Sequence, residues 1–331
     1  MDPTEKMSRQ LSYAKAILEA TDQAMGLSND VIVLGQLVDT QSGIFGTTTG
    51  LVNKYGAHRV MDFPVSENLM TATAMGAALT GLRPIIAHQR LDFMIYSLDA
   101  IANWLALWRF KSNGESAMPV TIRTIVGKGW GQGPQHSKSL HAWFAHLPGL
   151  RVAVPATAYD AKGLLLESIF SQTPAIFVEG RGLYSMLDDV PEEPYRVRFG
   201  QAVVRRSGAD VTVVAIGNLV PVALKAAAVL EKDGIDVEIV DPRTLNPLDR
   251  KTLCDSTFKT RRLVVADPAW HSFGAATEII TTVVENLGDK LKAKPVRVTL
   301  PDSHTPMSMS LEPEYYVDES DVIAAVKQTL A

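Results

Sequence analysis

A chain of 331 residues, with 46% apolar and 21% charged residues, is long enough for two α/β domains. The formal net charge of −4 and the absence of a basic block argue against a nucleic-acid partner, and a single cysteine, Cys254, excludes an internal disulfide framework and a multi-cysteine metal site. No apolar run approaches the roughly 18 residues of a membrane-spanning helix, and the first residues lack the apolar region of a signal peptide. We therefore expect a soluble cytoplasmic protein without a membrane partner.

Short β-branched runs alternate with helical segments in the first half of the chain. Helices of small or amphipathic residues are expected at 67–80 and 95–110. The runs expected as buried strands are residues 31–35, 83–88, 119–124, 151–155 and 175–180. This alternation predicts parallel βαβ units.

The pattern breaks at residues 187–200, which are rich in proline and acidic residues and are the expected linker. It then resumes, with helices expected at 220–232 and from about Gly274. Further strands are expected at 211–216, 235–240, 262–267 and 296–300. The predicted fold class is therefore α/β, with two doubly wound domains at residues 8–187 and 200–331.

The common nucleotide and nucleophile motifs are missing from the sequence. It contains no G-x-G-x-x-G after the first strand, no Walker sequence and no G-x-S-x-G elbow. The segment GKGWGQG (127–133) has the glycines of a phosphate cradle but lacks the following Ser or Thr and a clear helix. The favoured alternative is that these glycines simply allow positive φ in a mobile loop.

Glu67 opens a predicted helix that is otherwise made of small and apolar residues. In one interpretation Ser66 caps this helix, and the acid only complements the helix dipole, which is worth about 0.3–1 kcal/mol. In the other, the carboxyl group is buried among apolar neighbours and shares a proton with a ligand. The pattern alone leaves both open.

Three histidines follow the glycine-rich segment, at positions 136, 141 and 146. Their spacing is not that of helical metal ligands and no acidic residue joins them, so we expect no metal site. Each of them is either a packing or loop residue, or, for His136, a catalytic candidate.

The segment after the second expected strand carries a further group of candidates. If residues 83–89 form a strand, His88 and Arg90 point to one face as the strand ends, with Phe93 just beyond. Doubly wound sheets bind ligands at the carboxyl ends of their strands. The alternative is a solvated loop.

Taken together, these segments resemble the β subunit of the thiamine-diphosphate-dependent decarboxylase component of 2-oxo acid dehydrogenase complexes, and the wider transketolase family. The resemblance spans nearly the whole chain. It is carried by residues 43–67, by GPQHSKSLHAWFAHLPGLRVAVPATAYDAKGLL (133–165) and by VEIVDPRTLNPLD (237–249). It implies a pyrimidine-binding domain followed by a transketolase-type C-terminal domain.

The resemblance also implies roles for individual residues. Glu67 matches the glutamate that hydrogen-bonds a pyrimidine ring nitrogen of thiamine diphosphate and favours the tautomer able to remove the thiazolium proton. Phe93 matches the aromatic residue that packs on the pyrimidine ring. His136 matches the histidine beside the thiazolium, which stabilises oxyanion charge or assists acyl transfer. Gln36, where complex-forming relatives usually carry an acid, is a further cofactor-binding candidate.

In the family, the diphosphate and its Mg²⁺ are held by a separate α-type domain with a G-D-G pattern, which this sequence lacks. The resemblance therefore implies an α-type partner subunit that carries the metal site, and no metal ligand on this chain. It also implies an α₂β₂ assembly in which the C-terminal domain makes the β–β contact.

The sequence departs from the family pattern at several positions. Arg90 replaces an aromatic residue, His88 stands where an acidic or neutral residue is common, and Lys138 is expected nearby. These three residues are substrate-binding candidates that favour an anionic donor or acceptor. The alternative is that they are rim charges or contact the α-type subunit. Ser171 stands where some relatives carry an acid of a monovalent-cation site, so no potassium is predicted.

The leading functional hypothesis is the β-type subunit of a two-chain enzyme that decarboxylates a 2-oxo acid and transfers the acyl unit to a lipoyl carrier, with a lipoyl acyltransferase as a further partner. The alternative is a split transketolase or acyloin-forming carboligase that uses a soluble acceptor. A third hypothesis, a non-catalytic scaffold, is disfavoured because Glu67, Phe93 and His136 are all present.

Overall fold

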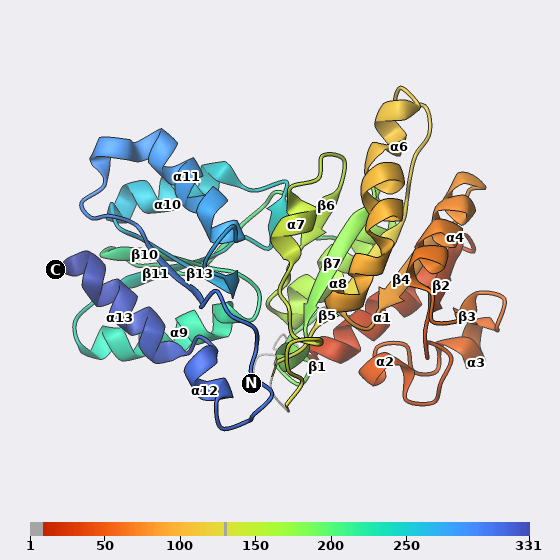
Figure 1. The fold of residues 1–331 in the computed structure, drawn as a ribbon, viewed down its shortest axis with the longest axis horizontal. Coiled ribbons are helices and arrows are strands. Elements are labelled where there is room, and N and C mark those ends of the chain that lie inside the picture. Colours follow the sequence, from red (N-terminus) through yellow and green to blue (C-terminus); the bar gives the residue numbers. More distant parts are fainter. Residues whose placement is uncertain (1–8, 129–130) are drawn as a thin grey trace, which may run out of the picture.

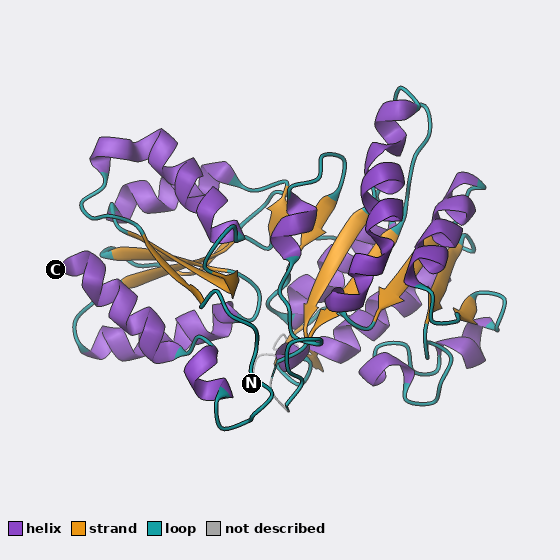
Figure 2. Ribbon diagram, viewed as in Figure 1, coloured by secondary structure: helices purple, strands orange, loops and turns teal. Residues whose placement is uncertain are grey.

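Two α/β domains with separate sheets form the structure, a computed structural model that describes residues 9–128 and 131–331. The first sheet has seven strands and the second has five, and helices cover both faces of each (Figures 1 and 2). The fold class predicted from the sequence is confirmed. No helix in the part of the chain that the structure describes is long and apolar enough to cross a membrane.

The first domain is built on a mainly parallel sheet, in the order β12-β6-β7-β5-β4-β2-β3. Its strands are almost entirely buried and rich in Val and Ile, as expected for a parallel sheet covered on both faces. They are β2 (Val31–Gly35), β3 (Val60–Asp62), β4 (Arg83–His88), β5 (Thr121–Val126), β6 (Arg151–Ala153) and β7 (Ala175–Gly180).

Helices α1 (Tyr13–Leu27) and α8 (Ala158–Ile169) pack together on one face of this sheet. The other face is covered by α4 (Glu67–Leu79), α7 (His141–Ala145) and a helical run that starts at Leu91. That run comprises α5 (Leu91–Met94), the 3₁₀ turn η1 (Ile95–Ser97), the π-helical η2 (Ala100–Leu105) and α6 (Ala106–Lys111). The helix expected at 95–110 is therefore present, but it is irregular and begins earlier.

Short elements complete the first domain. Two lie between β2 and β3, namely α2 (Gly43–Gly46) and α3 (Leu51–Tyr55), and η3 (Arg181–Leu183) follows β7. Strand β1 (Gln10–Ser12) pairs antiparallel with β8 (Leu187–Asp189). The first three residues of the expected linker therefore form a strand.

The second domain has the sheet order β14-β13-β10-β11-β9, parallel except for β9. Its strands are β9 (Val203–Arg206), β10 (Val211–Ala215), β11 (Val237–Asp241), β13 (Leu263–Trp270) and β14 (Val296–Leu300). Its helical elements are α9 (Leu219–Lys232), α10 (Arg250–Thr260), α11 (Ala275–Leu287), η4 (Gly288–Lys290), α12 (Glu312–Tyr315) and α13 (Glu319–Leu330).

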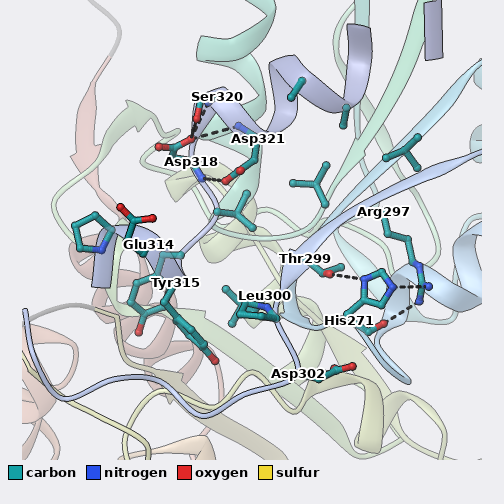
Figure 3. Close-up of a pocket in the computed structure, with 18 of the residues that line it drawn as sticks. His271, Arg297, Thr299, Leu300, Asp302, Glu314, Tyr315, Asp318, Ser320 and Asp321 are labelled. Carbon is teal, nitrogen blue, oxygen red and sulfur yellow. Dashed lines mark hydrogen bonds between the residues drawn. The ribbon is translucent and has the colours of Figure 1, made fainter. Parts of the chain in front are cut away.

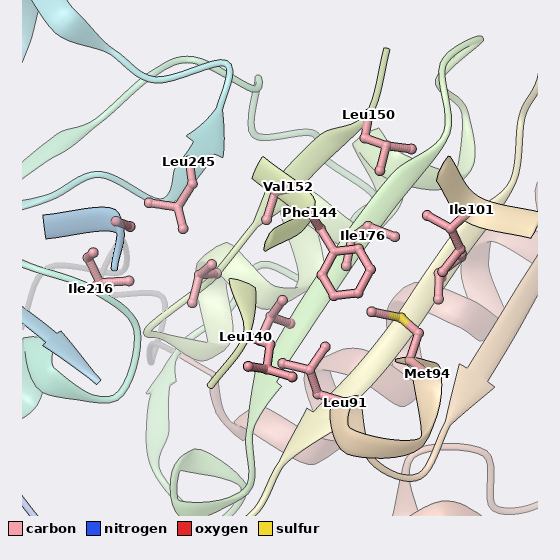
Figure 4. Packing of buried hydrophobic residues seen from close by; sticks show 14 of the residues in the cluster. Leu91, Met94, Ile101, Leu140, Phe144, Leu150, Val152, Ile176, Ile216 and Leu245 are labelled. Atoms are coloured by element: carbon pink, nitrogen blue, oxygen red, sulfur yellow. The ribbon is translucent and has the colours of Figure 1, made fainter. Parts of the chain in front are cut away.

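The two domains are joined by a common hydrophobic core and by a strand of the second domain that pairs with the first sheet. Strand β12 (Thr244–Asn246) leaves the second domain and pairs antiparallel with β6 at the edge of the first sheet. Phe144 of α7 is fully buried in one cluster with Val152 and Ile176 of the first domain and Ile216 and Leu245 of the second (Figure 4). The domains are therefore joined by continuous packing.

The order of the strands positions the site. The chain passes from β2 outward to β3, and α4 then crosses back to β4 on the other side of β2. The direction of winding reverses between β2 and β4, and such a reversal leaves a crevice at the carboxyl ends of the strands. Gln36 follows β2 and Gln89 follows β4 at this point.

Candidate functional site

A hydrogen bond bridges the two sides of the switch point. The Gln89 side-chain Nε2 donates to the Gln36 carbonyl oxygen at 2.6 Å. Gln36 itself is half-buried, and its Nε2 is buried without an acceptor among the described residues. The sequence-predicted Gln36 thus has an unpaired amide donor at the carboxyl ends of β2 and β4.

Phe93 and His136 lie in direct contact. Their rings are nearly perpendicular, at 89°, with centroids 5.4 Å apart, and both side chains are half-buried. Phe93 lies on α5 directly after β4, and His136 lies in the segment that follows β5, the neighbouring strand. The structure therefore brings two of the predicted site residues together at the carboxyl edge of the sheet.

The segment that carries His136 is hydrogen-bonded to α5 at Asp92, the residue before Phe93. The Lys138 backbone N–H and its Nζ both donate to Asp92 Oδ1, at 3.3 and 3.2 Å. Burial raises the pKa of the Asp92 carboxyl, while the Lys138 ammonium opposes that rise. Lys138, a predicted substrate-binding residue, is therefore engaged in an ion pair that positions His136.

Close packing explains the first glycine of the 127–133 segment. The Gly127 N–H donates to the His136 carbonyl oxygen at 3.2 Å, and a Cβ on Gly127 would lie only 2.3 Å from that oxygen. Gly131 and Gly133 have positive φ values of 65° and 63°, as the favoured alternative to a phosphate cradle requires. Gly129 and Trp130, in the middle of the segment, lie outside the described residues.

Glu67 begins α4, as predicted, and lies in its first turn, where an acid complements the helix dipole. The Ser66 side chain makes no capping hydrogen bond, and the Glu67 side chain is half-buried rather than buried. The neighbouring Val65 and Leu69 are 82% and 54% exposed. The carboxylate therefore lies at the edge of an exposed apolar surface.

His88 is buried and is not the cation that the sequence analysis proposed. It is 1% exposed, and its Nε2 lies 3.2 Å from Thr71 Oγ1 of α4. Burial lowers the pKa of His88 to about 3, so the imidazole is neutral near pH 7.

Arg90 is also buried, with 7% exposure, so it is neither a rim charge nor part of a solvated loop. Its Nη2 donates to Gln132 Oε1 at 2.8 Å, and its Cζ lies 5.5 Å from the centre of the Phe45 ring.

Several buried polar atoms at this edge have no partner among the described residues. They are Gln36 Nε2, His88 Nδ1, Arg90 Nη1 and Asp92 Oδ2. Buried polar groups are normally hydrogen-bonded, so a concentration of unpaired donors and acceptors is typical of a place where a ligand binds. Among these groups, Gln36 Nε2 offers a hydrogen-bond donor and the Phe93 ring offers an aromatic face, a combination that fits a polar aromatic heterocycle.

Sequence reasoning missed a buried charged network behind the site. Arg123 Nε donates to Glu179 Oε1 at 2.6 Å, Arg123 Nη2 donates to Thr47 Oγ1 at 2.8 Å, and the Tyr184 hydroxyl donates to Glu179 Oε2 at 2.5 Å. This network fixes the α2 loop, in which Phe45 has a positive φ of 54°. The sequence contained a signal for this network, because the otherwise apolar strands β5 and β7 each contain one charged residue.

A second concavity, of about 950 Å³, lies in the C-terminal domain (Figure 3). Three of its polar side chains contact one another: Arg297 Nη2 lies 2.7 Å from His271 Nε2, and the Thr299 hydroxyl lies 3.1 Å from His271 Nδ1. None of the sequence-predicted site residues lines it. Among the residues that the structure describes, no group of three or more potential ligands is arranged to hold a metal ion.

Comparison with known proteins matches both domains to family models. Residues 9–186 match the model of the transketolase pyrimidine-binding domain, and residues 200–322 match that of the transketolase C-terminal domain. The β subunit of acetoin:2,6-dichlorophenolindophenol oxidoreductase from Cupriavidus necator is 41% identical, over 98% of each chain. The pyruvate dehydrogenase E1 component subunit beta of Staphylococcus epidermidis is 37% identical, over 97% of this chain and 99% of that one. A solved structure described as a split gene transketolase, inactive beta4 tetramer, superposes with a TM-score of 0.78 at 23% identity, covering 97% and 98% of the two chains.

Proposed function

Because the chain belongs to the transketolase family, we propose that it is the catalytic β-type subunit of a two-chain enzyme dependent on thiamine diphosphate. The enzyme decarboxylates a 2-oxo acid and transfers the acyl unit to a lipoyl carrier. The single observation that carries this proposal is the contact between the Phe93 and His136 rings at the carboxyl edge of the first sheet, where β4 and β5 end. We assign residues 8–187 to the pyrimidine-binding domain and 200–331 to the C-terminal domain.

Each of the site residues has a part in this proposal. With thiamine diphosphate bound, Glu67 would hold a pyrimidine ring nitrogen through a shared proton, the Gln36 amide would donate to the same ring system, and Phe93 would pack on its face. When bound, the cofactor supplies an acidic carbon that adds to a carbonyl group, and a ring that accepts the electron pair. His136, held by Phe93 and by the Lys138–Asp92 pair, donates a hydrogen bond to the substrate oxygen on which negative charge develops.

The α-type partner completes the site in this proposal and holds the diphosphate and Mg²⁺. The half-buried Glu67 carboxylate beside the exposed Val65 and Leu69 supports a contact with another chain at this edge. For the β–β contact of an α₂β₂ assembly we propose a groove of about 1000 Å³ at the junction of the domains, where Trp143 and Phe273 are exposed.

Two other reactions remain candidates for the same site. One relative, at 41% identity, is described as an acetoin oxidoreductase, and acetoin is an α-hydroxyketone. This likeness favours cleavage of an α-hydroxyketone as one of the two reactions. Transfer to a free acceptor, as in a split transketolase, has weaker support, because the likeness at 23% identity concerns the fold alone.

The test is an assay of the reconstituted two-chain enzyme with thiamine diphosphate, Mg²⁺ and pyruvate or acetoin, using 2,6-dichlorophenolindophenol as the electron acceptor. We expect Glu67→Gln to lower kcat roughly 100-fold or more, because it removes a group that moves a proton. Glu115→Gln, at an exposed position, is the control. Acylation of an added lipoyl domain identifies the carrier reaction, and full activity of Glu67→Gln would refute the proposal.

A further inference from the structure

Arg90 presents a buried guanidinium that the chain leaves incompletely paired. The residue is 93% buried, and the described residues place no carboxylate within ion-pair distance of it. Nη2 donates to a neutral acceptor, Gln132 Oε1, while Nη1 is buried and has no acceptor within residues 9–128 and 131–331. The nearby Asp92 is already paired with Lys138.

An unpaired buried cation is an unfavourable arrangement. Removal from water weakens the hydration of the charge, and nothing replaces it unless an anion or several acceptors approach. Consistent with this, burial lowers the pKa of Arg90. A group kept under such conditions is expected to have its counter-charge outside the chain.

The guanidinium is nevertheless held in a defined place. Its Cζ lies over the ring of Phe45, 5.5 Å from the ring centre, and the Cζ of Arg181 approaches the same ring at 4.7 Å. The loop bearing Phe45 is fixed in turn by the hydrogen bond from Arg123 to Thr47. Stacking on an aromatic face orients the planar fork of an arginine while leaving its edge nitrogens to donate.

This place adjoins the proposed catalytic groups. A Cβ added to Gly127 would lie 3.7 Å from Arg90 Cζ and 2.3 Å from the His136 carbonyl oxygen, so the guanidinium and the His136 backbone pack around the same point. The His136 ring in turn contacts Phe93, three residues after Arg90. An anion at Nη1 would therefore lie close to the reacting groups.

We propose that Arg90 determines substrate specificity by binding a carboxylate or phosphate group of the donor or acceptor, distinct from the carboxylate that is lost as CO₂. A guanidinium binds such groups through two parallel hydrogen bonds. A substrate anion is favoured over a side chain of the partner subunit because Arg90 is buried, whereas the exposed apolar surface at Val65 and Leu69 lies on α4 and the residues before it. This inference rests on the function proposed above.

The first measurement is binding without turnover. The thermal unfolding midpoint of the reconstituted assembly is measured with increasing sodium malonate or inorganic phosphate, for wild type, Arg90→Met and Arg109→Met. Arg109 is an exposed arginine that, like Arg90, donates to one neutral side chain, Thr173, and is the matched control. We expect malonate, phosphate or both to raise the midpoint of wild type and of Arg109→Met, and not of Arg90→Met. The more effective anion identifies the substrate group.

The second measurement compares substrates that differ only by an anionic group. The pairs are 2-oxovalerate and 2-oxoglutarate as donors, which differ by a terminal methyl group in place of a carboxylate, and glyceraldehyde and its 3-phosphate as acceptors. We expect wild type to favour one anionic member in kcat/KM by roughly 100-fold or more, because its site is built to pair with it. Arg90→Met should abolish this preference by raising KM for the member with the additional anionic group, and Arg90→Lys should restore part of it.

Three results would overturn the inference. One is an equal response of wild type and Arg90→Met to anions and to both substrate pairs. Another is that anions stabilise the free chain but no longer stabilise the two-chain assembly, which would mean that a carboxylate of the partner already pairs with Arg90. The third is loss of all turnover in Arg90→Met. A wild-type assembly that binds anions at Arg90 but has no activity with any substrate would instead reject the proposed function.

Discussion

Gly127→Ala is expected to damage catalysis far more than folding. The added Cβ would lie 2.3 Å from the His136 carbonyl oxygen, whereas ordinary contacts of this kind begin at 3.4 Å, so the His136 backbone must move by about 1 Å. The same movement breaks the hydrogen bond from the Gly127 N–H to that oxygen, a loss of about 0.5–1.5 kcal/mol of stability. A displacement of about 1 Å at a catalytic group lowers the rate roughly 100-fold.

The assay is kcat/KM of the reconstituted two-chain enzyme, measured beside the free energy of unfolding of the free chain. Gly182→Ala is the control, because a Cβ at Gly182 meets nothing within 4 Å. We expect Gly182→Ala to retain wild-type activity. If Gly127→Ala were as active as Gly182→Ala, the close approach of this backbone would not position His136, and the reasoning would be refuted.

Three further predictions concern stability, each measured by chemical unfolding of the free chain. Arg123→Met should lower the free energy of unfolding by about 3–5 kcal/mol, because it leaves the buried Glu179 carboxylate unpaired; a loss below 1 kcal/mol would mean that the pair is not buried in solution. Gly76 lies on the exposed face of α4, and a Cβ added there meets nothing within 4 Å. Gly76→Ala should therefore raise the free energy of unfolding by about 0.5–1 kcal/mol, and a decrease would indicate that α4 is not helical at this position. The pKa of His88 is about 3 in the folded chain and 6.5 in the unfolded chain, so between these pH values only the unfolded chain takes up the proton. The stability that comes from the neutral His88 is therefore complete above pH 6.5. It is lost as the pH falls toward 3, by up to about 1.4 kcal/mol of unfolding free energy per pH unit. His88→Gln should remove this part of the acid sensitivity, and identical pH profiles for variant and wild type would contradict the burial of a neutral imidazole.

Much of the fold could be predicted because the relevant signals are local. The buried strands β2, β4, β5 and β7 are runs of β-branched residues, and each lies within two residues of the range expected from the pattern. The positions after β2 and β4 could then be assigned to the ligand edge, since the alternation of strand and helix already implies a parallel sheet. Strand β12 was missed because its pairing with β6 joins segments far apart in the chain, and three residues carry no periodicity.

The environment of the site residues was harder to predict, because burial and pairing are set by distant parts of the chain. His88 and Arg90 look like added positive charge in the sequence, yet the first is neutral and the second lies beneath the glycine-rich segment and Phe45. Lys138 looked available, but Asp92 pairs with it. Glu67 is half-buried beside the exposed Val65 and Leu69, and the helical pattern of α4 alone does not determine how far a side chain in its first turn is buried.

The C-terminal domain has a part in the site beyond any contact between subunits. The short helix α7 follows the His136 segment directly, and residues at both of its ends contact the C-terminal domain. His141 Nε2 lies 2.9 Å from Asp267 Oδ1 of β13, and the Asn246 amide of β12 donates to the Ala145 carbonyl oxygen at 3.1 Å. Asp267 is fixed by backbone N–H groups of Ala269 and Ala276, so its place is set by the fold of the second domain. Because Asp92 holds the same segment from the first domain, the position of His136 depends on contacts with both domains.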